Sequence, residues 1–177
     1  MPHDDARRLE QLSARAATAY HEAGHMVAAW RMRVKIHKAT IVPTEIYLGC
    51  VHHESPLRRI NLEVDGSDRA EIKANKMVLI CLVGPAAERR HNPSLSLGSS
   101  LPSYHGKSDY DLAPDLAFRL ASNNEVADAY LKWMQLRAEA LNVSNWNFVV
   151  AFANRLLERG TLEYGEIGEL VSDVVRG

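Results

Sequence analysis

The sequence predicts an α+β fold that is predominantly helical, with a small sheet of two or three strands. Two observations carry this prediction. Apolar residues recur at helical spacing through most of the chain, whereas residues 38–53 are rich in β-branched and aromatic side chains. With 177 residues and 46% apolar composition, the chain is long enough for one domain with a core and too short for two well-developed ones. We therefore expect a single domain over residues 1–177.

The expected elements follow one another along the chain. Residues 6–33 combine helical periodicity with good helix formers and predict the first helix. Residues 38–53 predict two short strands, with Pro43 at an edge or a turn. Residues 55–66 show no clear period and predict a surface loop. The spacing and the stop signals predict later helices at residues 68–90, 124–141, 145–159 and 164–175.

Residues 91–108 are the most loop-like part of the chain, and a helix is expected to follow them. Ser108, with the acidic Asp111 three positions later, has the form of a capping box. Pro114 is expected to disturb this helix or to delay its start to about Asp111, because proline is easiest to place in the first turn.

Residues 21–25 read His-Glu-Ala-Gly-His and fit the pattern H-E-x-x-H within the first helix. His21 and His25 stand on one helix face, about 6 Å apart along the axis, so both imidazoles can reach one ion. Glu22 would place its carboxylate beside the metal, where it can take a proton from water. Gly24 costs about 1 kcal/mol of helix stability relative to alanine, which indicates a close approach to the backbone there. The alternative is a helix that carries two surface histidines by chance.

A catalytic zinc site usually has three protein ligands plus water, so a third ligand must come from downstream. The extended form H-E-x-x-H-x-x-G-x-x-H is excluded, because no histidine lies six residues after His25. A downstream aspartate or glutamate is therefore favoured. The candidate residues are Asp109, Asp111, Glu88, His105, His91, His52 and His53.

Several ordered blocks resemble the peptidase domain of the FtsH-type ATP-dependent zinc proteases. The segment from Tyr20 to Ala28 is similar, almost letter for letter, to the ligand helix of that family. Ser108-Asp109 falls where the family has an asparagine-aspartate pair whose aspartate binds zinc. The resemblance extends over residues 18–172. Further similar blocks are residues 38–43 with Leu48-Gly49, residues 82–88 and residues 156–162.

The resemblance implies a single zincin-like metallopeptidase domain in which His21, His25 and Asp109 bind Zn²⁺ and Glu22 is the general base. Asp111 remains an alternative third ligand, and either aspartate could instead complement a helix dipole. Glu88 matches a family glutamate on the neighbouring helix. It is expected to support the site, as carboxylates that orient metal-bound imidazoles commonly do.

These residues together predict a zinc-dependent metalloendopeptidase that hydrolyses peptide bonds with a metal-activated water. A strand containing the adjacent residues Leu48, Gly49, Cys50 and Val51 could bind an extended peptide or protein substrate by edge addition. Two alternatives stay open. One is a zinc-binding regulatory or interaction domain that has lost proteolysis, and the other is a scaffold without metal.

Composition and sequence length limit the classes of partner and the cellular location that we expect. The formal net charge of -1 gives no electrostatic case for nucleic acid or for an anionic membrane, and basic pairs such as Arg58-Arg59 are expected to be solvated. No membrane insertion is expected, because the longest apolar run, residues 77–83, is far shorter than the roughly 20 residues of a membrane helix. Two separated cysteines and an N-terminus without an apolar core favour a cytoplasmic location.

The family resemblance also raises the question of assembly. The AAA-type ATPase module and the membrane helices of the family have no counterpart in the sequence, so we expect a lone peptidase domain. A separate AAA-type ATPase is one expected partner, and a homo-oligomer is another.

Overall fold

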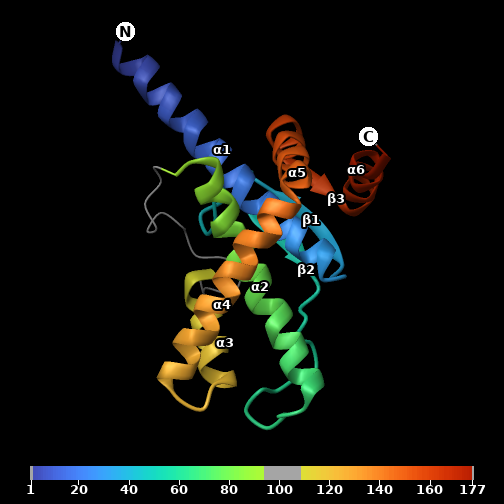
Figure 1. Ribbon diagram of the computed structural model, residues 1–177. Coiled ribbons are helices and arrows are strands. Elements are labelled where there is room, and N and C mark those ends of the chain that lie inside the picture. Colours follow the sequence, from blue (N-terminus) through green and yellow to red (C-terminus); the bar gives the residue numbers. More distant parts are fainter. Residues whose placement is uncertain (1, 94–108, 177) are drawn as a thin grey trace.

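The structure is a computed structural model that describes residues 2–93 and 109–176 (Figure 1). These residues are predominantly helical with a small antiparallel sheet, which confirms the predicted α+β composition. The elements, in chain order, are α1 (Pro2–Arg31), β1 (Ile36–Thr40), β2 (Cys50–His53), α2 (Asp68–His91), α3 (Asp109–Leu120), α4 (Asn124–Ser144), α5 (Trp146–Arg159), β3 (Thr161–Glu163) and α6 (Tyr164–Arg176).

The predicted helices and the first two strands are found close to their expected positions, and two details differ. The turn after α5 contains β3, which residue patterns did not place, since it is only three residues long. The expected delay of the third helix to Asp111 is wrong, because α3 already begins at Asp109 and holds Pro114 in its interior. The proposed cap residue Ser108 and most of the expected loop, residues 94–108, lie outside the described residues.

The sheet has the order β2-β1-β3, so β2 is an edge strand within the described part of the chain. Thr40 pairs with Cys50 on one side and with Thr161 on the other. Gly160 makes the tight connection from α5 into β3 with φ of 74°, a conformation that glycine adopts without a steric penalty. Because β1 pairs with β3, the sheet connects a segment from the first quarter of the chain with one near its C-terminal end.

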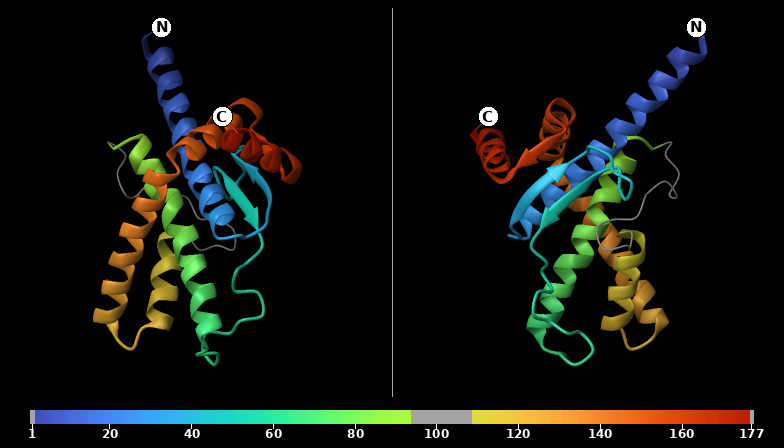
Figure 2. Two further views of the ribbon diagram at one scale, coloured as in Figure 1. Left: turned by 45° about the vertical axis from the view of Figure 1, so that its right-hand side comes forward. Right: turned by 180° about the vertical axis from the view of Figure 1, so that it is seen from behind.

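The C-terminal half of α1 lies in the middle of the molecule, and its N-terminal half projects beyond the other elements (Figures 1 and 2). Helix α2 packs antiparallel against α1, and α3 and α4 pack against α2. Helix α5 and the sheet also contact α1. Gly24 permits a close approach: a Cβ atom there would lie 2.7 Å from the Val83 carbonyl oxygen and 2.9 Å from the Gly84 Cα. The predicted close approach at Gly24 is confirmed. It brings the two helices close enough for α2 to contact both histidines of α1.

In the described residues, no helix combines the length and the apolar composition needed to cross a membrane.

Candidate metal centre

The two histidines of α1 are buried, and each is oriented by α2 through its Nδ1 atom. His25 Nδ1 lies 2.8 Å from the carbonyl oxygen of Ile80. Because a carbonyl can only accept, His25 Nδ1 carries the proton and Nε2 is left with a lone pair in the neutral ring. His21 Nδ1 lies 2.7 Å from Glu88 Oε2, so an ionised Glu88 imposes the same tautomer. Both imidazoles thus present Nε2 to the same point.

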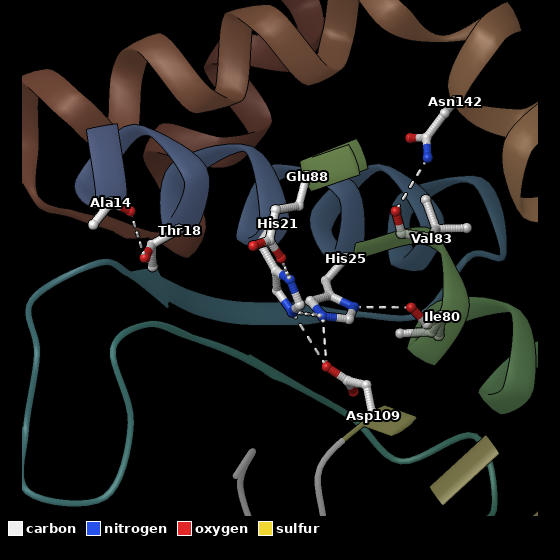
Figure 3. A network of polar contacts seen from close by, with 9 residues as sticks. All are labelled: Ala14, Thr18, His21, His25, Ile80, Val83, Glu88, Asp109 and Asn142. Atoms are coloured by element: carbon white, nitrogen blue, oxygen red, sulfur yellow. Dashed lines mark hydrogen bonds and ion pairs between the residues drawn. The ribbon is translucent and has the colours of Figure 1, made fainter. Parts of the chain in front are cut away.

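Asp109, the first residue of α3, completes this arrangement (Figure 3). Its Oδ2 atom lies 3.3 Å from His21 Nε2 and 3.0 Å from His25 Nε2. The two Nε2 atoms are themselves 3.0 Å apart. Two nitrogen lone pairs and a carboxylate oxygen therefore converge on one small volume, an arrangement that a cation would stabilise.

The residues present fit a zinc ion. One ligand atom from each of His21, His25 and Asp109 lies within 4.8 Å of the other two. Tetrahedral zinc with bonds of about 2.0–2.1 Å would hold its ligand atoms about 3.3 Å apart. The observed separations of 3.0 to 3.3 Å are close to that value. A set of two imidazoles and one carboxylate is also a donor set that zinc prefers at catalytic sites.

The pKa values show how strongly these groups interact without an ion. Burial alone would lower the pKa of His21, but hydrogen bonds with Asp109 and Glu88 raise it to about 10. Burial opposes ionisation of Asp109, yet His25 and His21 hold its pKa well below the usual range. The carboxylate is therefore ionised and available as a metal ligand.

Glu22 lies in the turn between the histidines and is buried. Burial raises its pKa, while the nearby His21 and His25 lower it. Its side chain packs against the backbone of Gly49, where an added Cβ would lie 2.8 Å from both Cγ and Oε1 of Glu22. A residue larger than glycine would not fit at position 49 without a shift, because the Glu22 carboxylate occupies the space beside it.

The other third-ligand candidates do not join this group. Asp111 is exposed on α3 and is not part of the cluster of potential ligands. His91 stacks on Tyr20, with ring centroids 3.7 Å apart. His53 is directed to the backbone by a 2.7 Å contact from Nδ1 to the Glu54 carbonyl oxygen. His52 lies on β2 outside the cluster, and His105 falls outside the described residues.

The predicted substrate strand needs a correction. Strand β2 begins at Cys50, so Leu48 and Gly49 precede it, and only Cys50 and Val51 of the predicted stretch lie in a strand. Gly49, just before the strand, has its backbone packed against Glu22 and Thr18. The edge position of β2 still leaves one side of that strand without a partner among the described strands.

Gly84 and Ile80 were missed by sequence reasoning although both contact His25. A Cβ atom on Gly84 would collide with the His25 imidazole and lie 2.5 Å from its Cε1 atom. The available signal was a glycine next to Pro85 within a helix, a combination that is costly unless packing requires it. Ile80 acts only through its carbonyl oxygen, which side-chain patterns cannot reveal.

Sequence comparisons relate the chain to known proteins only distantly. No protein-family profile matches the chain. The chain is similar to the ATP-dependent zinc metalloprotease FTSH 9, chloroplastic/mitochondrial, of Oryza sativa subsp. japonica, with 28% identity over 183 aligned positions. The alignment covers 87% of this chain and 21% of the relative, so the chain spans about a fifth of that protein's length. The similarity supports a relation to the FtsH-type zinc proteases.

Proposed function

We propose that this chain is a zinc-dependent metalloendopeptidase with a zincin-like site. The observation that carries the proposal is the convergence of His21, His25 and Asp109 beside the buried Glu22. The relation to a zinc metalloprotease supports the same chemistry. A purely structural zinc site usually has four protein ligands, whereas this cluster offers three and a neighbouring carboxylate suited to proton transfer.

The proposed roles follow from the contacts of each side chain. His21, His25 and Asp109 would hold zinc, which when bound supplies Lewis acidity toward water and the peptide carbonyl. Glu22 takes a proton from water on its carboxylate and later returns it to the leaving amine nitrogen. Glu88 fixes the ring of His21, and the Ile80 carbonyl fixes that of His25.

The decisive test compares the parent protein with Glu22→Gln. Zinc content, measured by mass spectrometry, should stay near one ion per chain, since Glu22 is not a ligand. Cleavage of an unfolded protein such as casein should fall about 100-fold or more. Equal cleavage rates would refute the role of Glu22. Absence of cleavage in both proteins, with zinc bound, would favour a regulatory domain that has lost proteolysis.

A second comparison tests the third ligand. Asp109→Asn should reduce both the zinc content and the cleavage rate, because a neutral amide is a poorer ligand. Asp111→Asn is the matched control, two positions away on the same helix and exposed. We expect it to keep both properties. If Asp111→Asn instead lost zinc and cleavage while Asp109→Asn kept both, Asp111 would be the third ligand.

Substrate and assembly are part of the same proposal. An extended peptide would pair with the side of β2 that faces no other described strand, beside Glu22 and Gly49. A separate AAA-type ATPase and self-association remain proposed partners, and casein cleavage with and without added ATPase would test the first of them.

A further inference from the structure

A basic cavity lies outside the metal centre, near the C-terminal end of α1. Its volume is about 390 Å³. Its lining contains a single carboxylate, that of Glu54. The cationic side chains that line it are Arg33, Arg58, Arg59, Arg69, Lys73 and Lys76.

These cations come from three parts of the chain. Arg33 follows the end of α1, and Arg58-Arg59 belong to the segment after β2, which runs beside α2 (Figure 2). Arg69, Lys73 and Lys76 lie on α2 at a spacing of four and then three residues, so they share one helix face. The basic pair Arg58-Arg59, expected to be a scattered solvated feature, is therefore part of a cluster. Six of the chain's 21 Lys and Arg residues line this cavity, although the chain has a net charge of -1.

The cluster is held in place without being neutralised. Lys76 Nζ donates to the Met32 carbonyl oxygen at 3.1 Å, and Lys73 Nζ donates to that of Arg58 at 3.4 Å. Both lysines are half-buried, and these hydrogen-bond partners are neutral carbonyl groups. Among the side chains that the structure describes, no carboxylate forms an ion pair with the four lining arginines.

Asp65, an acidic residue outside the lining, is hydrogen-bonded to Ser67. Hydrogen bonds from Ser67, and to a smaller extent the charges of Arg69 and Lys73, lower the pKa of Asp65. Its Oδ1 atom accepts hydrogen bonds from the Ser67 hydroxyl at 2.6 Å and from the Ser67 backbone N–H at 3.1 Å. Asp65 offsets part of this positive charge but forms no ion pair with Arg69 or Lys73, and within the described part of the chain these cations have no paired carboxylate.

Two residues of the cavity adopt a costly backbone conformation. Arg33 has φ of 56° and Arg59 has φ of 63°, and they are the non-glycine residues with positive φ in the described part of the chain. Side chains with a Cβ rarely adopt this region, and such outliers concentrate at binding sites. Val34 N–H donates to the Ala29 carbonyl oxygen at 2.8 Å, and Ile60 N–H donates to that of Leu57 at 2.9 Å. The positive φ of each arginine thus closes a local turn that also places it at the cavity.

We propose that this cavity binds a compact anion carrying two or more phosphate groups, of the size of a nucleoside polyphosphate. Small-molecule sites usually have volumes of roughly 300–1,000 Å³, and this cavity falls in that range. Guanidinium groups bind phosphate oxygens in a bidentate manner, while lysines add point charges. A concave cluster confined to one cavity suits a compact polyanion better than a nucleic acid strand, which needs an extended basic track.

The site can be tested apart from the proposed peptidase activity, because the two share no residue. Ile80, which contacts His25, is four residues beyond Lys76 on α2, so about one helical turn separates them. The proposal goes beyond the proposed function and does not depend on it.

The test measures binding of inorganic tripolyphosphate to the full chain by calorimetry, using a charge-matched pair of variants. Arg33→Gln with Arg58→Gln removes two exposed cavity cations, and Arg7→Gln with Arg8→Gln removes two exposed cations near the start of α1. We expect one saturable site, weakened at least about tenfold in the cavity variant and less than about twofold in the control. Thermal unfolding checks that each variant is folded. Chelation of any bound metal by the probe would be the same in all three proteins.

Competition distinguishes the sources of the phosphate groups. Displacement of tripolyphosphate by ATP, without binding to vesicles that contain phosphatidylinositol bisphosphate, would assign the site to a soluble nucleotide-like ligand. Vesicle binding that is lost in the cavity variant would assign it to a lipid headgroup. No saturable binding, an equal loss in both variants, or tighter binding of an acidic peptide than of tripolyphosphate would overturn the proposal.

Discussion

Glu88 and His21 are joined by a 2.7 Å hydrogen bond that links α2 to the centre of α1. The bond holds the His21 ring so that Nε2 is directed toward Asp109, and it places a negative charge behind the imidazole. A carboxylate in this position makes an imidazole a better metal ligand.

Glu88→Ala is expected to weaken zinc binding about 10–100-fold, because His21 loses its orienting partner. A competition titration with a zinc-binding dye measures the affinity. Glu88→Gln keeps an oxygen acceptor and should show a smaller loss. Equal affinities for the parent and Glu88→Ala would show that the hydrogen bond is irrelevant to the metal.

Gly84→Ala is expected to destabilise the fold by about 1–3 kcal/mol and to lower zinc content, because the added methyl group would collide with the His25 ring. Chemical denaturation and metal analysis measure the two effects. Gly66→Ala is the matched control, since a Cβ there meets no atom within 4 Å. A tolerated Gly84→Ala would mean that His25 can move away from its observed position.

Gly49→Ala is expected to separate catalysis from metal binding. The new methyl group would press on the Glu22 carboxylate and on Thr18, while all three proposed ligands stay in place. The casein cleavage rate should fall about tenfold or more, with zinc content unchanged. Gly49→Pro additionally tests substrate pairing at this edge, and unchanged cleavage of peptides by that variant would count against such pairing.

Metal removal should lower the thermal stability of the protein. Without zinc, the buried Asp109 carboxylate must be balanced by protons on the histidines, as the raised pKa of His21 indicates. Dialysis against a chelator should reduce Tm by about 10 °C, and excess zinc should restore it. Calorimetry measures the shift. A Tm that is insensitive to both treatments would exclude a tightly bound ion.

The two cysteines should be unreactive in the folded protein. Burial, followed by the charges of Glu22 and Asp109, raises the pKa of the Cys50 thiol to about 12, and burial raises that of Cys81 well above its usual value. At pH 8 a thiol reagent should modify neither residue until denaturant is added, since the thiolate is the reactive form. Rapid modification of the native protein would show that the region around Cys50 opens.

The local sequence was sufficient to predict the part of the site that lies on a single helix. The spacing of His21 and His25 fixes their common face whatever surrounds them, and the position of Glu22 follows from the same helical geometry. Helix and strand positions were predictable for a similar reason, because apolar periodicity records which face is buried. The three-residue β3 was not, since so short a segment carries no period.

Residue spacing left the distant partners open; the family resemblance pointed to Asp109 and Glu88, and the tertiary structure brings both to His21. Asp109 lies 88 residues from His21 and Glu88 lies 67 residues from it, and a sequence pattern does not state which acidic residue returns to the site. Likewise, Arg33, Arg58 and Arg69 line one cavity because the end of α1, the segment after β2 and α2 come together in the fold. The sequence determined a helix with two imidazoles and one carboxylate on it. Folding decided which oxygen and which cations would meet, because contacts between remote segments depend on how helices pack rather than on local spacing.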